Sequence, residues 1–406
     1  MRLLHTSDWH LGHTLHDFSR EDEHQAFLQW LLSTVGERAV DVLLVAGDLF
    51  DTSNPSAAAQ RLLYEFLAQL HQRYPSLQTI LLGGNHDSAD RLDAPDSLLR
   101  VLGVQVVGGL RPQQGWGRCL VPLRGVSGEV EGWCVAVPYL RPADLPVGEL
   151  SQAAGISRRY HEVFEELDRV KSPGQVVVAT GHLYMAGGEI SELSERRIQV
   201  GNQQVVSADI FPPSVDYVAL GHLHKAQRVG GKEHVRYCGS PIPLALDEAS
   251  YTHQVCLVDL IPGQPTRVEV IPVPRWVDII RVPARGSAPL EEVVRQLRVL
   301  PPASEGEENA RRPWLSVKVE LTGPEPGLRP RLEEALKGKN ARLVRIQVEN
   351  PSQVLPGEEP PLTELRTLVP EEVFVKKYAR QYKGNPPGEE LLTLFRQVLE
   401  EVQGAS

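Results

Sequence analysis

The stretch Val42-Leu43-Leu44-Val45-Ala46-Gly47-Asp48 carries the pattern on which the prediction of the fold rests. A run of five apolar residues, typical of a buried strand, stops at a glycine and is followed by a carboxylate. In open α/β folds, ligands bind at the carboxyl ends of the strands. The stretch therefore predicts an α/β fold with Asp48 at its functional edge.

Four further motifs have the same arrangement, each after a predicted strand: Asp8-Trp9-His10, Gly84-Asn85-His86-Asp87, Gly181-His182 and Gly221-His222-Leu223-His224. A glycine precedes the polar residue in four of the five motifs, where it lets the backbone turn sharply or approach a ligand closely. One such motif alone is uninformative, because a lone Gly-His or Asp-x-His has ordinary structural explanations. Five of them in order predict one shared site.

Residues 1–274 alternate strand and helix patterns, which is typical of an α/β domain. The predicted strands are Arg2–Thr6, Val42–Ala46, Thr79–Leu82, Val104–Val107, Cys134–Pro138, Val176–Thr180, Tyr217–Leu220 and Val235–Cys238. The predicted helices are Glu21–Val35, Ala57–His71 and Ser157–Arg169.

The polar residues of the motifs form a set of oxygen and nitrogen donors without a thiolate: Asp8, His10, Asp48, Asn85, His182, His222 and His224. Such a set suits Mn²⁺, with Mg²⁺, Fe²⁺ and Zn²⁺ as competitors. These donors are too many for one ion that keeps positions open for water and substrate. If one carboxylate bridges, they divide into four and four, which predicts two divalent ions about 3.5–4 Å apart.

The ordered motifs resemble the calcineurin-like metallophosphoesterase superfamily, whose fold is a four-layer αββα sandwich. Within it, the chain is similar to the SbcD family of bacterial nuclease subunits. The resemblance rests on Ser7-Asp8-Trp9-His10-Leu11-Gly12, on Gly47-Asp48-Leu49-Phe50-Asp51-Thr52, and on Tyr217-Val218-Ala219-Leu220-Gly221-His222-Leu223-His224 with the later Tyr237-Cys238-Gly239-Ser240-Pro241. It covers residues 1–274 well and the following segment loosely.

The resemblance implies a role for each motif residue. One ion is expected on Asp8, His10, Asp48 and His224, and the other on Asp48, Asn85, His182 and His222, with Asp48 as the bridge. His86 is expected to be catalytic and to assist the leaving sugar oxygen, by protonation or by hydrogen bonding. Archaeal and eukaryotic relatives often have a histidine where Asp51 stands, so a scheme with two assisting histidines is not carried over. Asp51 and Asp87 are instead candidates for orienting neighbouring groups.

The pattern restarts after residue 274 and predicts four segments. Taken with the resemblance, residues 1–274 are expected to form a metallophosphoesterase nuclease domain, 275–350 a small α+β capping domain for DNA recognition, 351–361 a Pro/Glu-rich linker, and 362–406 a helical tail. In the small domain we expect strands at Ile279–Val282, Leu315–Leu321 and Arg342–Val348 and helices at Leu290–Leu300 and Leu328–Lys337.

The tail carries two helical patterns, Pro370–Lys383 and Pro387–Gln403. Each is expected to expose an aromatic face, with Phe374 on the first and Phe395 on the second. Amphipathic helices beyond a flexible linker suit docking into a partner's groove. The resemblance implies that the partner is an SbcC-type coiled-coil ATPase. It also implies a homodimer formed by helices near Ala57–His71, whose apolar stripe alternatively packs on the domain's own sheet.

Bulk composition narrows the function classes. The 406 residues carry a net charge of −10, which argues against a uniformly basic nucleic-acid binder. It does not exclude a nuclease, because bound metal ions present positive charge locally to a phosphate. Four cysteines lie far apart without a CxxC pair, which predicts buried free thiols. No apolar run approaches the ~20 residues of a membrane span, and the first residues do not resemble a signal peptide. A bacterial cytoplasmic protein, associated with the nucleoid when engaged on DNA, is expected.

Together with the resemblance, these features predict a metal-dependent DNA phosphodiesterase. It would process double-strand ends and hairpins, and cut single strands internally, in DNA repair, recombination and replication. A phosphoesterase for small molecules or phosphoproteins is the alternative, which the small domain and the tail disfavour. A non-catalytic scaffold is a second alternative, which the complete set of donors disfavours.

Overall fold

The computed structural model describes residues 1–125, 127–189, 205–303, 311–323 and 325–350, and single positions between Phe374 and Phe395. The chain divides into two compact units, Met1–Glu349 and Asn350–Ser406. The predicted linker, 351–361, lies outside the described residues, as does most of the predicted tail.

Two six-stranded sheets form the centre of the first unit. The first sheet has the order β14-β13-β1-β4-β5-β6. Its parallel strands are β1 (Arg2–Thr6), β4 (Val42–Val45), β5 (Gln78–Leu82) and β6 (Val104–Val107). Its antiparallel pair is β13 (Gln254–Asp259) and β14 (Arg267–Pro272). The second has the order β11-β12-β10-β9-β8-β7, with the parallel strands β8 (Val130–Val137), β9 (Val176–His182), β10 (Tyr217–Gly221) and β12 (Lys232–Tyr237), and the antiparallel edges β7 (Leu120–Arg124) and β11 (Gln227–Val229).

Helices cover the outer face of each sheet. They are α1 (Glu21–Glu37), α2 (Ala57–Arg73), α3 (Ala89–Asp93) and α4 (Asp96–Val101) on the first sheet and α5 (Gln152–Val170) on the second. Short 3₁₀ turns are η1 (Pro112–Gln114), η2 (Gly117–Cys119), η3 (Pro142–Asp144), η4 (Ala208–Ile210) and η5 (Leu246–Ser250).

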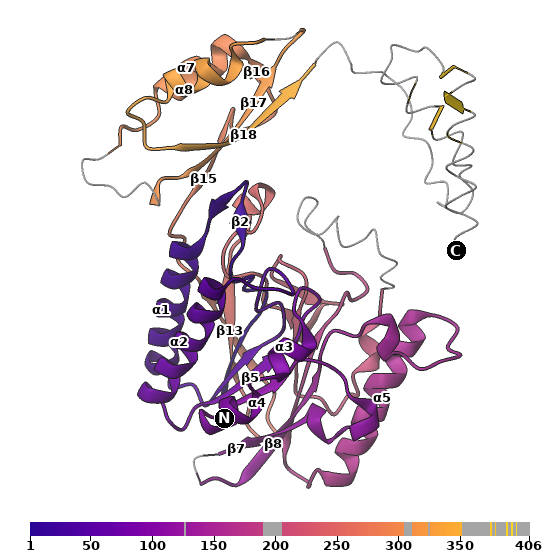
Figure 1. Cartoon of the computed structure of the whole chain (residues 1–406). Helices are drawn as coiled ribbons and strands as arrows, with labels where there is room; N and C mark the ends of the chain where they lie inside the picture. Colours follow the sequence, from indigo (N-terminus) through magenta and orange to yellow (C-terminus); the bar gives the residue numbers. More distant parts are fainter. Residues whose placement is uncertain are drawn as a thin grey trace. The chain divides into compact units, whose positions relative to one another are not determined.

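Successive residues of β1 show how the layers stack. Leu3 belongs to the core between the two sheets, whereas Leu4 belongs to the core shared with α1 and α2. Because side chains alternate along a strand, each sheet buries both of its faces. The arrangement is a four-layer αββα sandwich, as predicted (Figure 1).

The apolar stripe of α2 packs inside its own domain. Leu63, Phe66, Leu67 and Leu70 are buried, and the Phe66 ring meets the Trp9 ring edge-on at 5.6 Å. The helix begins where the Ser56 hydroxyl accepts a hydrogen bond from the Ala59 amide. These four residues therefore belong to the domain's core, and a homodimer formed by helices in this region stays a prediction.

A smaller sheet follows in the same unit. Its strands are β15 (Ile279–Val282), β16 (Ala288–Pro289), β17 (Trp314–Glu320) and β18 (Arg342–Glu349), all parallel, and its helices are α7 (Leu290–Arg298) and α8 (Leu328–Ala335). One face packs on α7 and α8. On the other side of the sheet, Trp314 and Val344 pack with Leu15 and Leu246 from the larger domain. The predicted strands and helices of this segment are confirmed, while the exact domain boundaries stay predictions.

The second unit shows aromatic packing of its own. Phe374 and Tyr378 are helical, as are Leu391 and Phe395. The rings of Phe374 and Phe395 stack with centroids 4.3 Å apart, and both side chains are half-buried. Phe374 and Phe395 therefore cover part of each other's aromatic surface, and docking of these helices to a partner stays a prediction.

Two further findings concern the described residues. All four cysteines are buried and free, as expected. Among the described helices, none is both long and apolar enough to span a bilayer.

Candidate metal centre

The predicted ligands all lie where strands end. Asp8 and His10 follow β1, Asp48 follows β4, and Asn85 follows β5; these strands are neighbours in the first sheet. His182 ends β9, and His222 and His224 follow β10, its neighbour in the second sheet. Because the carboxyl ends of these strands meet at one edge of the sandwich, the structure brings all seven residues together.

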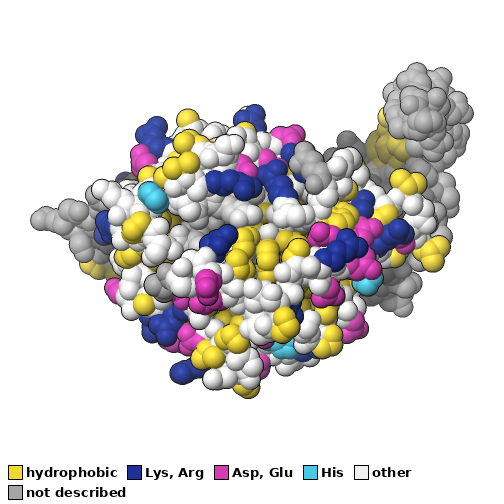
Figure 2. All heavy atoms as spheres, turned by 90° about the horizontal axis from the view of Figure 1, so that it is seen from below, with side chains coloured by type: hydrophobic (Ala, Val, Ile, Leu, Met, Phe, Trp, Pro, Cys, Tyr) yellow, Lys and Arg dark blue, Asp and Glu magenta, His cyan; other side chains and the backbone are white. Residues whose placement is uncertain are grey.

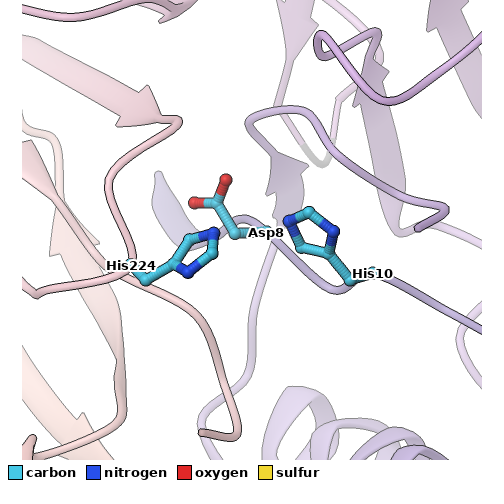
Figure 3. Close-up of side chains that lie close together, drawn as sticks. All are labelled: Asp8, His10 and His224. Carbon is cyan, nitrogen blue, oxygen red and sulfur yellow. The ribbon is translucent and has the colours of Figure 1, made fainter. Parts of the chain in front are cut away.

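Two overlapping groups of ligand atoms describe this cluster. Side-chain atoms of Asp8, His10 and His224 all lie within 4.8 Å of one another, and so do those of Asp8, Asp48 and His182. Figure 3 shows Asp8 between the two imidazoles of the first group, with His224 arriving from a different part of the chain. Asp8 is further held by the His222 amide, which donates to its Oδ1 at 2.9 Å.

The contacts of His182 test whether a cation fits here. Its Nδ1 lies 3.0 Å from the Ala46 carbonyl oxygen, which only accepts, so Nδ1 carries the proton. The lone pair of Nε2 then faces two more acceptors, Asp48 Oδ2 at 3.3 Å and Asn85 Oδ1 at 2.8 Å. Acceptors that face one another need a proton or a cation between them. The donor set therefore fits a divalent metal ion.

The electrostatics of this cluster agree with that fit. Burial would lower the pKa of His182, but the charges of Asp48 and Asp8 outweigh it and raise the pKa to about 9. Burial would likewise raise the pKa of Asp48, yet His182 and His10 hold it well below its usual value. The site therefore favours a positive charge between Asp48 and His182.

Two carboxylates orient histidines toward the centre. Nδ1 of His10 lies 3.2 Å from Asp51 Oδ1, and its buried Nε2 makes no hydrogen bond to any described residue. Nδ1 of His224 lies 2.9 Å from Oε1 of the fully buried Glu248. Carboxylates in this position set the tautomer and the orientation of a ligand histidine. Asp51 lies where such a carboxylate would lie, and its orienting role stays a prediction.

The backbone at the centre adopts unusual conformations. The backbone at Asp8, His10 and Asp48 has φ angles of 54°, 46° and 51°, which residues other than glycine rarely adopt. The loops after β1 and β4 hold each other in place, because the Asp8 amide donates to the Gly47 carbonyl and the His10 amide to that of Asp48, both at 3.0 Å. Strained backbone of this kind gathers at functional sites.

The glycines before the ligands act in different ways. Gly47 has a φ of 94°, and a Cβ there would lie 2.2 Å from Nδ1 of His182. A Cβ on Gly84 would lie 2.1 Å from Asp48 Oδ1, although its φ is not positive. Gly47 therefore provides both a turn and a close approach, whereas Gly84 provides the close approach alone.

His86 lies beside the proposed ligands, and one of its ring nitrogens is already hydrogen-bonded. Its amide donates to Asp48 Oδ1 at 2.9 Å, and Nδ1 lies 2.7 Å from the Asp51 carbonyl oxygen. Nδ1 therefore donates, and Nε2 is the nitrogen left for chemistry. One ring nitrogen also lies within 4.8 Å of ligand atoms of His10 and Asp48, so distance alone does not separate a ligand from a proton donor.

Asp87 fixes the loops rather than the ligands. Its carboxylate is buried and accepts hydrogen bonds from the amides of Leu49, Phe50 and Gly84 at 2.9–3.1 Å. Burial and the nearby charge of Asp48 raise its pKa to about 6 despite these bonds. It ties the Asp48 loop to the loop that carries Asn85 and His86.

A cavity of about 660 Å³ opens beside the centre. His10, Asp51, His86 and His224 line it together with His13, Thr14, Leu15, His16, Asp17, Leu244, Ala245, Leu246 and Arg345. The sequence motifs include none of His13, His16, Glu248 and Arg345. No local motif marks these four, because tertiary structure alone brings them to the site.

Comparison with known proteins places this site in a family. The model described as calcineurin-like phosphoesterase matches residues 1–226. The SbcD protein of the nuclease SbcCD from Rhodobacter capsulatus is 40% identical over 93% of this chain and 94% of its own length. The chain belongs to the SbcD branch of the calcineurin-like phosphoesterase family.

Other comparisons agree with membership of this family. The SbcD proteins of Bacillus subtilis and Escherichia coli K12 are 30% and 39% identical, over 99% and 68% of this chain and the same shares of their own lengths. A second model, described as type 5 capsule protein repressor C-terminal domain, matches residues 275–382. The predicted family and fold are confirmed. Membership also implies divalent metal ions, which the clustered carboxylates and imidazoles fit.

Proposed function

We propose that this protein hydrolyses phosphodiester bonds of DNA at a centre of two divalent metal ions. The observation that carries the proposal is the meeting of donors from both sheets around Asp48. Its Oδ2 lies 3.4 Å from Nε2 of His10 and 3.3 Å from Nε2 of His182. A carboxylate between imidazoles from opposite sheets is suited to bridge two ions.

The proposed ligands divide around that bridge. Asp8, His10, Asp48 and His224 hold one ion, and Asp48, Asn85, His182 and His222 hold the other. The mixture of oxygen and nitrogen favours Mn²⁺ over Mg²⁺, Fe²⁺ and Zn²⁺. Asn85 is a neutral ligand, so the loaded centre keeps a net positive charge that attracts a phosphate.

The chemistry then divides between the ions and the chain. Bound divalent ions activate water and spread the negative charge of the transition state. His86 assists the leaving sugar oxygen from Nε2, because Nδ1 is fixed on the Asp51 carbonyl. The Glu248 and Asp51 carboxylates keep His224 and His10 in the orientation that binding needs.

The proposed substrates are double-strand ends and hairpins, with internal cleavage of single strands. The protein's own charge gives only limited attraction for DNA. Its net charge is −10, and the face in Figure 2 mixes basic with acidic side chains. Tight binding is therefore expected to need the metal ions and a partner.

We propose that the partner is an SbcC-type coiled-coil ATPase, which binds the helices of the tail. Leu391 is more than one-third exposed and offers an apolar contact there. The protein is further proposed to work as a homodimer in the bacterial cytoplasm, at the nucleoid when it is engaged on DNA.

The test compares two substrates for the purified full chain. With Mn²⁺, it should cleave labelled single-stranded and hairpin DNA as well as the dye substrate bis(p-nitrophenyl) phosphate. A chelator or Asp48→Asn should abolish both activities. Cleavage of the dye without cleavage of DNA would favour a small-molecule phosphoesterase, and neither activity would favour a scaffold.

A further inference from the structure

A bulge interrupts β18 close to the metal centre. Leu343 pairs with Leu315 and Arg345 pairs with Ser316, so Val344 is an extra residue between them. Bulges redirect the side chains that follow and are frequent beside active sites.

The bulge changes which side Arg345 faces. Leu343 and Ile346 pack toward α7 and α8, whereas Val344 packs on the opposite side with Leu15 and Leu246. In a regular strand, residue 345 would share the side of residue 343. Instead, Arg345 lines the cavity beside the metal centre. This cavity lies next to the face of the small sheet on which Val344 packs.

The part of the cavity rim next to Arg345 is formed by the hairpin of β2 (Thr14–Leu15) and β3 (Phe18–Ser19). Its two-residue turn, His16-Asp17, has φ angles of 48° and 69°, as hairpin turns of this length require. The Phe18 and Trp314 rings lie 5.6 Å apart, so the hairpin contacts the small sheet (Figure 1). Burial and the positive charge of Arg345 both lower the pKa of His16, which agrees with their shared position at the rim.

Arg345 differs from its neighbour Arg342 in what it contacts. Arg342 lies over the Trp314 ring at 3.7 Å and is occupied by that packing. Arg345 is half-buried, and no carboxylate of the described residues lies within 4 Å of its guanidinium. A guanidinium donates parallel hydrogen bonds to a phosphate and keeps its charge at all working pH values.

We propose that Arg345 binds a DNA backbone phosphate adjacent to the one at the metal centre. The small sheet thereby becomes part of the substrate site, and DNA is distinguished from diesters with a single phosphate. This inference rests on the proposed function.

The experiment measures steady-state cleavage by the full chain with Mn²⁺ over a series of salt concentrations. The substrates are a single-stranded oligonucleotide and bis(p-nitrophenyl) phosphate. Arg345→Ala should raise KM for the oligonucleotide by about tenfold, the size expected for a lost charged hydrogen bond, with a smaller change in kcat. The loss on the dye should be several times smaller. The slope of log(kcat/KM) against log salt should become less negative by about 0.7, as expected for one phosphate contact on a single strand.

Two further variants sharpen the comparison. Arg345→Lys should restore most of the salt slope but not all of KM, since lysine keeps the charge and loses the paired geometry. Arg295→Ala is the matched control, because Arg295 lies on α7, is 75% exposed and pairs with Glu292. It should behave as the unaltered protein does.

The outcomes separate the two proposals. If the unaltered protein cleaves the dye but not DNA, the proposed function fails. If it cleaves DNA and Arg345→Ala leaves KM and the salt slope unchanged, the role of Arg345 is refuted and the proposed function stands. Equal losses on DNA and dye would also refute the phosphate contact, because they would place Arg345 in support of the centre itself.

Discussion

The carboxylate of Glu248 contacts the imidazole of His224, with Oε1 lying 2.9 Å from Nδ1. The other carboxylate oxygen accepts from the Leu244 amide at 2.7 Å, so both oxygens are engaged. Glu248 belongs to η5, whose Leu246 packs with Trp314 of the small sheet. The segment that orients a proposed metal ligand is therefore itself held by the small sheet.

Because of this contact, we expect Glu248→Gln to weaken the binding of one metal ion more than the binding of the other. A glutamine oxygen can accept from His224 or from Leu244, but its NH₂ cannot accept from the second donor. We expect the affinity for the ion on His224 to fall by about 10- to 100-fold, the usual effect of losing such a support. Calorimetric titration with Mn²⁺ measures it. Glu233→Gln, at an exposed glutamate, is the control, and equal affinities in the two variants would contradict the proposed role.

His86→Ala should abolish cleavage while leaving both ions bound. The reason is that Nδ1 of His86 donates to the Asp51 carbonyl and Nε2 is proposed to serve the leaving group. Metal content of the purified variant, measured by mass spectrometry, decides the matter. His161→Ala, at an exposed histidine on α5, should change neither quantity. Loss of an ion from His86→Ala would show that His86 is a ligand.

Asp87→Ala should destabilise the fold even without metal. The change leaves the buried amides of Leu49, Phe50 and Gly84 without their acceptor. Each unsatisfied donor costs about 1–3 kcal/mol, so we expect a loss of at least about 3 kcal/mol in the free energy of unfolding. Urea unfolding in the presence of a chelator measures it. Asp90→Ala, at an exposed carboxylate of the adjoining α3, should have little effect, and equal midpoints for both variants would refute this account of Asp87.

Deletion of Leu362–Ser406 should separate catalysis from partner binding. All proposed ligands lie before residue 225, so Mn²⁺-dependent cleavage of single-stranded DNA should be largely kept. Association with an SbcC-type ATPase, and ATP-stimulated processing of duplex ends, should be lost. Co-purification with the ATPase compares the truncated and full chains. Undiminished association would refute the role of the tail, and failure of the truncated chain to fold would show that the tail belongs to the core.

The parts of the fold that sequence reasoning predicted are those with a local cause. β1 and β6 occur with the expected bounds, because their leucine and valine residues are buried in the first sheet. The predicted start of α5 was wrong by five residues, because the Ser151 hydroxyl accepts from the Ala154 amide and starts the helix earlier. The strand predicted to end at Pro138 ends at Val137, since proline cannot donate to the sheet ladder.

The residues of the site can likewise be separated into those that a local sequence pattern predicts and those that it does not. Asp8, Asp48 and His182 could be predicted, because each closely follows or ends a strand and parallel strand ends converge. Glu248 and Arg345 could not, because they reach the site through a 3₁₀ turn and a bulge that carry no sequence signature. The sequence pattern therefore did not reveal the support of His224 by Glu248 or the position of Arg345 at the rim of the cavity, although it did indicate Asp51 and Asp87 as supporting residues.

The number of ions bound by the Asp48 variant tests the central claim most directly. The claim is that one carboxylate, 3.4 Å from Nε2 of His10 and 3.3 Å from Nε2 of His182, serves two ions. Calorimetric titration with Mn²⁺ should find two sites in the unaltered protein, none of comparable affinity in Asp48→Ala, and one mainly weakened site in His10→Ala. Loss of a single ion in both variants would contradict the bridge and with it the proposed two-metal centre.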